Sequence, residues 1–331
     1  MNLHNDKDAF RVLINLIHEQ TGYREDVLEK DYYVCLILKE LAEKQRDGLP
    51  AYFKGGTALY KALKTTRRFS EDIDLSVDAR DCSRTQNAKR LERSTKEYEG
   101  LERIPELGKA NRSEVISVYQ YEPVSVYDAE DALQRFGKLK VEATSFTISE
   151  PVEELEVASI LYEMASPEQR EILERNYDVN PFMVQTIALE RIFIDKLFAA
   201  ESYVRRSADP HRAFEAAKHI YDLAVLRDNE KIKALMSHEQ KMLYLLNIRM
   251  TEEKERLDGV AGVSPQMFVF FFMAEQNDAV RKAYEIMQRQ YVLRDEDRIP
   301  FEQAMNTLNQ IRMKLMENRA WRDYDKMSMK H

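Results

Sequence analysis

Residues 54–76 have the sequence KGGTALYKALKTTRRFSEDIDLS, which is the densest chemical pattern in the chain. A short apolar run comes before the pair Gly55-Gly56, and a helical pattern begins at Thr57. We predict a short strand, a tight turn at the glycines and a short helix. Glycines let backbone N–H groups approach a phosphate closely, and the N-terminus of the helix would add positive potential. The Thr57 hydroxyl could donate a hydrogen bond to the same phosphate.

The end of this stretch, EDIDLSV, alternates with a period of two. In a strand, Ile73, Leu75 and Val77 would share one face, and Asp72 and Asp74 would share the other. Two carboxylates on one face suit the joint binding of a hard divalent cation such as Mg²⁺. The acid pair therefore predicts a metal site next to the glycine turn.

A later strand could supply a third carboxylate. Residues 138–148 form a second strand-like run, in which Glu142 lies on the polar face together with Lys140. If that strand pairs beside the first, Glu142 would join the two aspartates. Three carboxylates around one or two Mg²⁺ ions, next to a phosphate cradle, are typical of phosphoryl or nucleotidyl transfer. Taken singly, each feature has a simpler explanation, namely an ordinary turn, a solvated strand face and a surface glutamate.

The rest of the chain predicts an α/β half followed by a helical half. The expected elements are helices over 6–20 and 25–46, a solvated helix over 83–103, a strand over 115–121, a boundary loop over 176–181 and helices after about 182. The phenylalanines of 268–272 and the methionines Met305, Met313 and Met316 are expected in the helical core.

Composition excludes several classes of protein. Apolar residues make up 44% of the 331 residues and aromatic residues 10%, which is too much for a disordered chain. The 9 glycines and 9 prolines are few for a turn-dense all-β fold. The net charge of −8 argues against a protein that coats duplex DNA, although a local positive patch could still bind a nucleotide.

Other classes of site and location are also disfavoured. Two cysteines cannot build a disulfide framework, and six scattered histidines show no zinc spacing. Neither a Walker A loop nor a Rossmann glycine fingerprint occurs. Charged residues occur within the first ten positions, which argues against a signal peptide, and the longest apolar run, 267–274, is too short for a bilayer. We expect a soluble, cytoplasmic protein without membrane contact.

Residues 54–76 closely resemble the AbiEii-type nucleotidyltransferase toxins, a branch of the DNA polymerase β-like nucleotidyltransferase superfamily that includes the MenT toxins. The motifs KGGTAL and RFSEDIDLS carry this resemblance. The segment EKDYYVCLILKELA (29–42) is similar to the family's leader helix, and KVEAT (140–144) to its third motif. The pair IDKLFA (194–199) and HIYDL (219–223) is similar to its fourth motif, so the resemblance covers about 25–226.

The resemblance implies an α+β fold. Residues 1–180 would form a polymerase β-like nucleotidyltransferase domain, a mixed sheet with flanking helices and N-terminal helices. Residues 181–331 would form an α-helical domain that contributes Lys196 and Asp222 to the cleft. From the residues alone, Lys196 fits a snorkelling surface lysine, and Asp222 fits an i,i+4 pair with Lys218.

The resemblance also implies roles for individual residues. Gly55, Gly56 and Thr57 would form the phosphate-facing turn, with Arg68 and Ser70 beside the triphosphate. Asp72, Asp74 and, more loosely, Glu142 would bind Mg²⁺. Lys196 would contact the nucleotide phosphates, and Asp222 would orient Lys196 or the acceptor hydroxyl. Two basic groups could steer a triphosphate or an RNA, or be solvated charge: Lys61, Lys64, Arg67 and Arg68, and Arg205, Arg206, His211 and Arg212.

The implied function is a Mg²⁺-dependent transfer of NMP from an NTP to an RNA acceptor, with the tRNA 3′ end as the best candidate, and release of pyrophosphate. The protein would be the toxin of a toxin–antitoxin pair with a cognate antitoxin, and growth arrest or phage defence would be the outcome. Two alternatives stay open. One is transfer of NMP or phosphate to a protein target, and the other is a non-catalytic nucleotide-binding scaffold.

Overall fold

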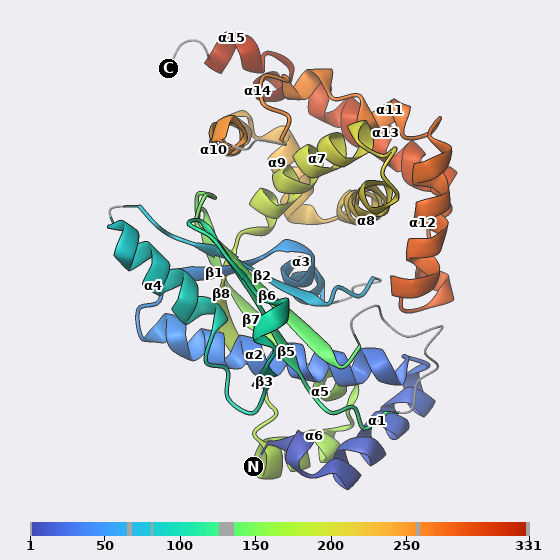
Figure 1. Ribbon diagram of the computed structural model, residues 1–331. Helices are drawn as coiled ribbons and strands as arrows, with labels where there is room; N and C mark the ends of the chain where they lie inside the picture. Colours follow the sequence, from blue (N-terminus) through green and yellow to red (C-terminus); the bar gives the residue numbers. More distant parts are fainter. Residues whose placement is uncertain (1, 65–67, 81, 126–135, 256–258, 329–331) are drawn as a thin grey trace. The chain divides into compact units, whose positions relative to one another are not determined.

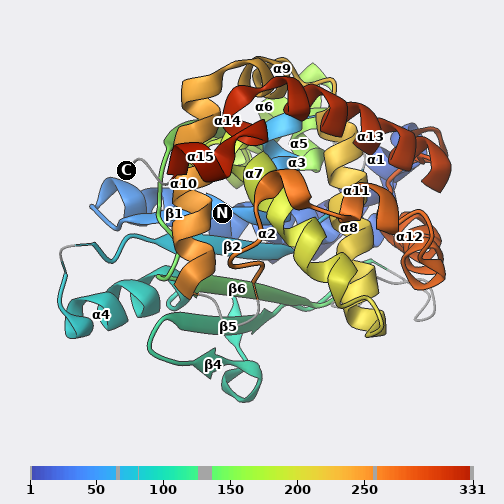
Figure 2. The same cartoon turned by 90° about the horizontal axis from the view of Figure 1, so that it is seen from above.

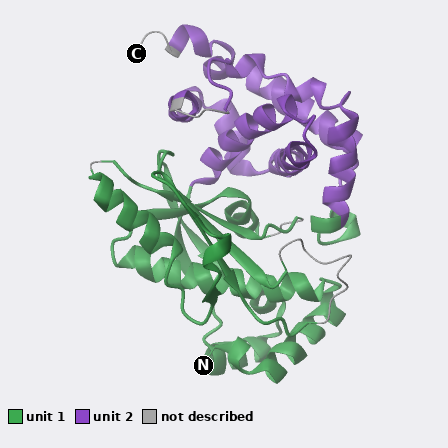
Figure 3. Ribbon diagram, in the orientation of Figure 1, with its two compact units in different colours: residues 1–187, 290–297 green, residues 188–289, 298–331 purple. Residues whose placement is uncertain are grey.

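The chain folds into two compact units, shown in Figure 3. A computed structural model describes residues 2–64, 68–80, 82–125, 136–255 and 259–328. Unit 1 comprises Met1–Ile187 and Gln290–Asp297, and unit 2 comprises Ala188–Arg289 and Arg298–His331. The first unit therefore ends after residue 187, beyond the predicted boundary at 180, and a short segment from late in the sequence belongs to it.

Unit 1 is built on a mixed sheet (Figures 1 and 2). Its strands are β1 (Ala51–Lys54), β2 (Asp72–Val77), β3 (Glu102–Arg103), β4 (Lys109–Ala110), β5 (Glu114–Gln120), β6 (Lys138–Thr144), β7 (Val152–Val157) and β8 (Phe182–Ile187). The order is β3-β5-β6-β2-β1-β8-β7, and β4 pairs with β5. Strands β2 and β6 are parallel, as are β1 and β8, while the other neighbours are antiparallel.

Helices flank this sheet in Figure 1. They are α1 (Lys7–Thr21), α2 (Glu25–Arg46), α3 (Gly55–Leu63), α4 (Arg84–Thr95), α5 (Ile160–Met164) and α6 (Pro167–Tyr177). Local sequence explains their ends. The Asp6 side chain accepts a hydrogen bond from the Ala9 N–H at the start of α1, and Gly22 ends that helix in the left-handed conformation. Ser83 and Gln86 form a capping box at the start of α4.

The core of unit 1 follows the predicted alternation. Ile73, Leu75 and Val77 of β2 are fully buried, and so are the apolar residues of β6, Leu139, Val141 and Ala143. The predicted α+β architecture, a mixed sheet with flanking helices followed by a helical region, is thus confirmed.

Three expectations about unit 1 were wrong. Gly55 and Gly56 do not form a separate turn, because α3 begins directly at Gly55 after β1. The solvated helix ends at Thr95, and the end of the predicted 83–103 range holds the short strand β3. The region after 182 does not begin with a helix, because Phe182–Ile187 is strand β8. That strand is parallel to β1 and antiparallel to β7, which the sequence reading missed.

Helix α2 carries an unusual run of buried charge. Glu29, Lys30 and Asp31 are all 0% exposed. The Glu29 carboxylate accepts hydrogen bonds from the N–H groups of Val124 and Ser125. Asp31 forms an ion pair with Lys61 at 2.6 Å and also accepts the Ile160 N–H. Burial without such partners would be costly, so these contacts fix α2 against the rest of unit 1.

The Asp31→Ala variant is expected to lower the free energy of unfolding by about 3–5 kcal/mol, because it leaves the Lys61 ammonium buried without its carboxylate. Urea denaturation measures the change. The exposed pair Lys64–Glu156 provides the matched control, and Glu156→Ala is expected to cost less than about 1 kcal/mol. Equal effects of the two variants would show that burial does not strengthen the Lys61–Asp31 pair.

Unit 2 is helical in the described residues. Its helices are α7 (Leu189–Arg205), α8 (Pro210–Leu226), α9 (Glu230–Ser237), α10 (Glu239–Glu255), α11 (Phe270–Met273), α12 (Asp278–Tyr291), α13 (Phe301–Glu317), α14 (Arg319–Arg322) and α15 (Tyr324–Ser328), with the last two residues of α12 in unit 1. Phe268 packs edge-on against both Phe198 and Trp321 in its core. Two of the residues expected in this core, Phe272 and Met313, are instead exposed.

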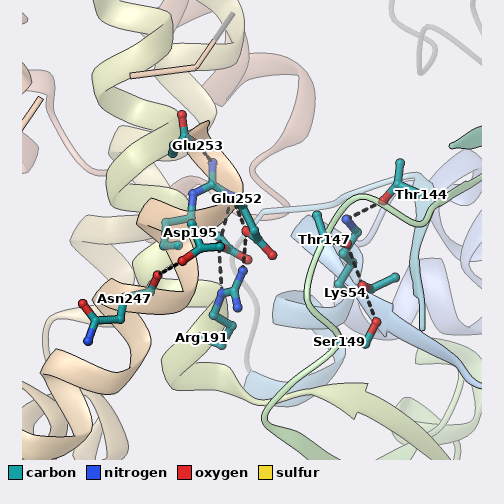
Figure 4. Close-up of polar contacts among 12 residues, drawn as sticks. Lys54, Thr144, Thr147, Ser149, Arg191, Asp195, Asn247, Glu252 and Glu253 are labelled. Carbon is teal, nitrogen blue, oxygen red and sulfur yellow. Dashed lines mark hydrogen bonds and ion pairs between the residues drawn. The ribbon is translucent and has the colours of Figure 1, made fainter. Parts of the chain in front are cut away.

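Unit 2 also contains a buried ionic cluster, drawn in Figure 4. The Arg191 guanidinium pairs with Asp195 at 3.0 Å and with Glu252 at 2.6 Å. Arg249 pairs with Glu252 and Glu253, so the cluster brings together two arginines and three carboxylates. Within the described parts of the chain, no helix is both long enough and apolar enough to cross a membrane.

Candidate active site

Strand β2 places Asp72 and Asp74 on the face opposite its buried apolar residues, because successive side chains alternate. The register then brings in two neighbouring strands. On β6, which is parallel to β2, Lys140 is the partner of Asp72 and Glu142 is the partner of Asp74. On β1, Lys54 is the antiparallel partner of Asp74. Partner positions point to the same side of a sheet, so three carboxylates and two lysines share one surface.

The glycine pair lies directly against this surface. A Cβ atom placed on Gly55 would be 2.2 Å from the Asp74 Oδ2 atom, and Gly55 has a φ of +80°. A Cβ atom on Gly56 would be 2.7 Å from the Ser70 Oγ and 3.3 Å from a guanidinium nitrogen of Arg68. Both positions therefore require glycine, because a Cβ atom would lie too close to these neighbouring side chains. The start of α3 is thus packed against an acid, a hydroxyl and a cation.

Thr57 ties α3 to the strand that carries the acids. Its hydroxyl is fully buried, donates to the Asp72 carbonyl and lies 3.1 Å from the Ser70 Oγ. A hydroxyl has one proton to donate, and the bond to the Asp72 carbonyl uses it. The hydrogen bond to a phosphate that the sequence suggested for Thr57 would need the same proton. The structural contribution of Thr57 is thus to hold the start of α3, Ser70 and β2 together.

A segment distant in sequence braces the residues before β2. The Phe69 N–H donates to the Tyr291 carbonyl at 2.7 Å, and Arg68 forms an isolated bridge with Val292. The Tyr291 hydroxyl donates to Glu71 at 2.8 Å, and Lys30 donates to the same carboxylate at 2.5 Å. Sequence reasoning missed this brace, since no local pattern links residue 291 to residues 68–71.

The Tyr291→Phe variant is expected to lower the melting temperature of the protein, with a cost of about 1 kcal/mol for the lost hydrogen bond to Glu71. Tyr284→Phe is the matched control in the same helix, because the buried Tyr284 hydroxyl has no hydrogen-bond partner and its removal should be neutral or stabilising. Thermal unfolding compares the two variants. A Tyr291→Phe protein as stable as Tyr284→Phe would contradict a brace at this position.

Lys140 lies among the acids. Its Nζ is 3.2 Å from the Asp72 Oδ2 and 3.0 Å from the Glu142 Oε2. From the sequence, Lys140 was expected on the polar face of its strand, with no role assigned to it. Lys54, also missed, donates to the Thr144 hydroxyl at 3.0 Å, as Figure 4 shows.

The electrostatics of the acid group centre on Asp74. Burial and the neighbouring Glu142 carboxylate raise the pKa of Asp74 from its ordinary 3.8 to about 6, and Lys140 only partly offsets this. The donor set consists of hard carboxylate oxygens and carries excess negative charge, so it fits a divalent cation. Among the described residues, however, no three His, Cys, Asp or Glu side chains are grouped as a ready metal site. Asp72 and Glu142 are instead bound to Lys140.

Lys196 and Asp222 form a buried pair within unit 2. The Lys196 Nζ is 2.6 Å from the Asp222 Oδ2, and each side chain is about 5% exposed. Both simpler explanations from the sequence were wrong, because Lys196 does not snorkel at the surface and Lys218 pairs with Glu215 instead. Asp222 is thus the ion-pair partner of Lys196, and the roles of both residues towards the nucleotide and the acceptor hydroxyl stay predictions.

Several residues of the predicted basic groups form ion pairs with acids. Lys61 is buried against Asp31, and Lys64 pairs with Glu156 at 2.5 Å. Arg205 pairs with Glu201 at 2.7 Å. Arg67 lies outside the described residues. Lys61 therefore has a structural role, which was not the role offered by the sequence reading.

Comparison with known proteins identifies the family of the chain. The family model described as "Nucleotidyl transferase AbiEii toxin, Type IV TA system" matches residues 36–307. No functionally curated protein matches the sequence. Similar solved structures include the nucleotidyltransferase toxin MenT4 from Mycobacterium tuberculosis, with 16% identity, a TM-score of 0.47 and coverage of 91% of this chain and 98% of that chain. Another is JHP933 from Helicobacter pylori, with 16% identity, a TM-score of 0.42 and coverage of 93% and 100%. Because the family model spans most of its length, the chain belongs to the AbiEii nucleotidyltransferase toxins of type IV toxin–antitoxin systems.

Proposed function

We propose that this nucleotidyltransferase moves an NMP group from an NTP to the 3′ hydroxyl of an RNA, with tRNA as the expected acceptor. The observation that carries the proposal is the contact between the glycines at the start of α3 and the acids. The Asp74 carboxylate lies directly against Gly55, so an anion cradle and a cation-binding group would lie side by side in one site. Substrate phosphates and a divalent cation must meet in this way for nucleotidyl transfer.

The phosphates would be held by residues of this chain at the start of α3. Backbone N–H groups at a helix N-terminus attract anions, and the missing side chains of Gly55 and Gly56 leave room for close approach. The Arg68 guanidinium beside Gly56 supplies a fixed positive charge, and Ser70 supplies a hydroxyl at the same place. Tyr291 and Lys30 hold Glu71 and thereby position Ser70.

Asp72 and Asp74, with Glu142 as a third candidate, would bind Mg²⁺. When bound, the cation neutralises phosphate charge and lowers the pKa of the attacking hydroxyl. The acceptor oxygen forms a bond to the α-phosphorus, the bond from that phosphorus to the bridging oxygen breaks, pyrophosphate leaves and the hydroxyl proton passes to water. Lys196, oriented by Asp222, would contact the nucleotide phosphates, which is the role that the resemblance implies.

Incubation with α-³²P-labelled NTPs, Mg²⁺ and total RNA tests the proposal. We expect label on the RNA and release of pyrophosphate with the wild type, and no label with Asp72→Asn. Asp78→Asn is the matched control, because Asp78 follows β2 directly and pairs with Arg80 outside the acid group. Transfer by Asp72→Asn at the wild-type rate would contradict the proposal.

The same assay separates the alternative functions. Label in the protein fraction of a lysate would identify a protein acceptor. Binding of NTP and Mg²⁺ in calorimetry, without transfer to RNA or protein, would identify a scaffold. For the toxin role, we expect growth arrest when the wild type is induced, relief by its cognate antitoxin, and normal growth with Asp72→Asn.

A further inference from the structure

Lys140 lies in the place where a bridging cation would be expected. Its ammonium group contacts Asp72 on β2 at 3.2 Å and Glu142 on its own strand at 3.0 Å. The side chains are 21%, 27% and 26% exposed for Lys140, Asp72 and Glu142, so water screens these contacts only in part. The parallel register of β2 and β6 fixes this arrangement, because it sets Lys140 opposite Asp72 and Glu142 opposite Asp74.

An ammonium group and a divalent cation compete for the same carboxylates. A hard cation needs direct contacts to such oxygens at about 2.0–2.6 Å, while Lys140 occupies one oxygen of Asp72 and one of Glu142. The two cations also repel each other at this range. A lysine ammonium group is positively charged at neutral pH, so Lys140 competes as a cation.

We propose that Lys140 is a built-in competitor of the divalent cation. It pairs with Asp72 and Glu142 in the metal-free protein and must withdraw before a cation can bind both acids. Its flexible four-carbon stem allows the withdrawal. The released ammonium group then needs a new anionic partner, and an NTP phosphate at the neighbouring start of α3 has the right charge. Cation and nucleotide would therefore bind cooperatively. The inference rests on the proposed function only in assuming that the acid group binds a divalent cation.

Binding of Mn²⁺ to the full-length protein without nucleotide tests this role, with free Mn²⁺ measured by its EPR signal. Lys140→Met and Lys140→Gln are expected to bind Mn²⁺ about ten-fold more tightly than the wild type, because they remove a unit charge close to the site. Lys140→Arg keeps the charge and should stay within about two-fold of the wild type. Lys138→Met is the matched control, since Lys138 is exposed on the same strand.

Two further measurements test where Mn²⁺ binds and whether its binding is coupled to the nucleotide. Adding Asp74→Asn to Lys140→Met should abolish the gained Mn²⁺ affinity, which places the cation at the acid group. A non-hydrolysable NTP analogue should tighten Mn²⁺ binding to the wild type more than to Lys140→Met, because only the wild type has an ammonium group to release.

Unchanged or weaker Mn²⁺ binding by both Lys140→Met and Lys140→Gln would overturn the inference, because Lys140 would then be neutral or would help to organise the acids. The assay contains no acceptor, so its result is separate from the proposed function. If these variants bind Mn²⁺ more tightly but the wild type transfers no nucleotide, the proposed reaction is contradicted. The proposed role of Lys140 would still be supported.

Discussion

The Asp74→Asn variant is expected to lose nucleotidyl transfer by at least about 1,000-fold while the metal-free protein becomes more stable, by on the order of 1 kcal/mol at neutral pH. The loss follows from the removal of a charge aimed at the cation and the phosphates. The gain follows from the pKa of Asp74, which burial and Glu142 raise to about 6 in the folded protein. Asparagine has a similar shape and no charge to bury.

The direction of the pH dependence follows from the same raised pKa. Between its ordinary 3.8 and about 6, the folded protein holds a proton on Asp74 that the unfolded chain releases. Unfolding then releases a proton, so stability falls as the pH rises through this window, and the penalty is complete above it. Asp74→Asn should therefore gain more over the wild type at pH 7.5 than at pH 4.5, as measured by thermal unfolding in the presence of a chelator.

Asp78→Asn is the opposite case on the same stretch of chain. Hydrogen bonds from Arg80 lower the pKa of Asp78, so its charged form stabilises the folded state at neutral pH and this contribution is lost as the pH falls. Asp78→Asn should destabilise the protein slightly at pH 7.5 and keep transfer activity. A stabilised Asp78→Asn protein, or a destabilised Asp74→Asn protein at pH 7.5, would contradict this account of the site.

The Gly55→Ala variant is expected to reduce transfer by about 100-fold or more and to destabilise unit 1 by more than about 1 kcal/mol. Two causes add. The φ of +80° is unfavourable for any residue with a Cβ atom, and the new methyl group would lie 2.2 Å from the Asp74 carboxylate oxygen. The carboxylate must move, and the site loses the contact between the acid and the phosphate cradle.

Gly48→Ala separates these two causes. Gly48 has nearly the same φ, +82°, with no atom within 4 Å of an added Cβ. It should show the backbone cost of about 1 kcal/mol alone, with transfer unchanged. Steady-state transfer rates and urea midpoints of both variants make the comparison. If Gly55→Ala behaved like Gly48→Ala in both measurements, close approach at Gly55 would have no functional meaning.

The strands differed in how well their sequences predicted them. Strand β2 was predictable because one face is buried and the other carries acids, which produces a strict alternation. Strand β7, VEELEV, lies at the edge of the sheet and buries little, so its pattern is weak. Strand β8, FMVQTI, is a short run with no strict alternation, which periodicity alone does not distinguish from the start of a buried helix.

By itself, the sequence determined the acid pair and the glycine pair, because both depend on spacing within a few residues and on the period of a strand. Only the tertiary structure decided that Lys140 binds Asp72, that Asp222 binds Lys196 and that Tyr291 holds Glu71. Strand register, helix packing and the return of a distant segment set these contacts. These contacts depend on how the whole unit buries its apolar residues, so the pattern within a few residues does not predict them.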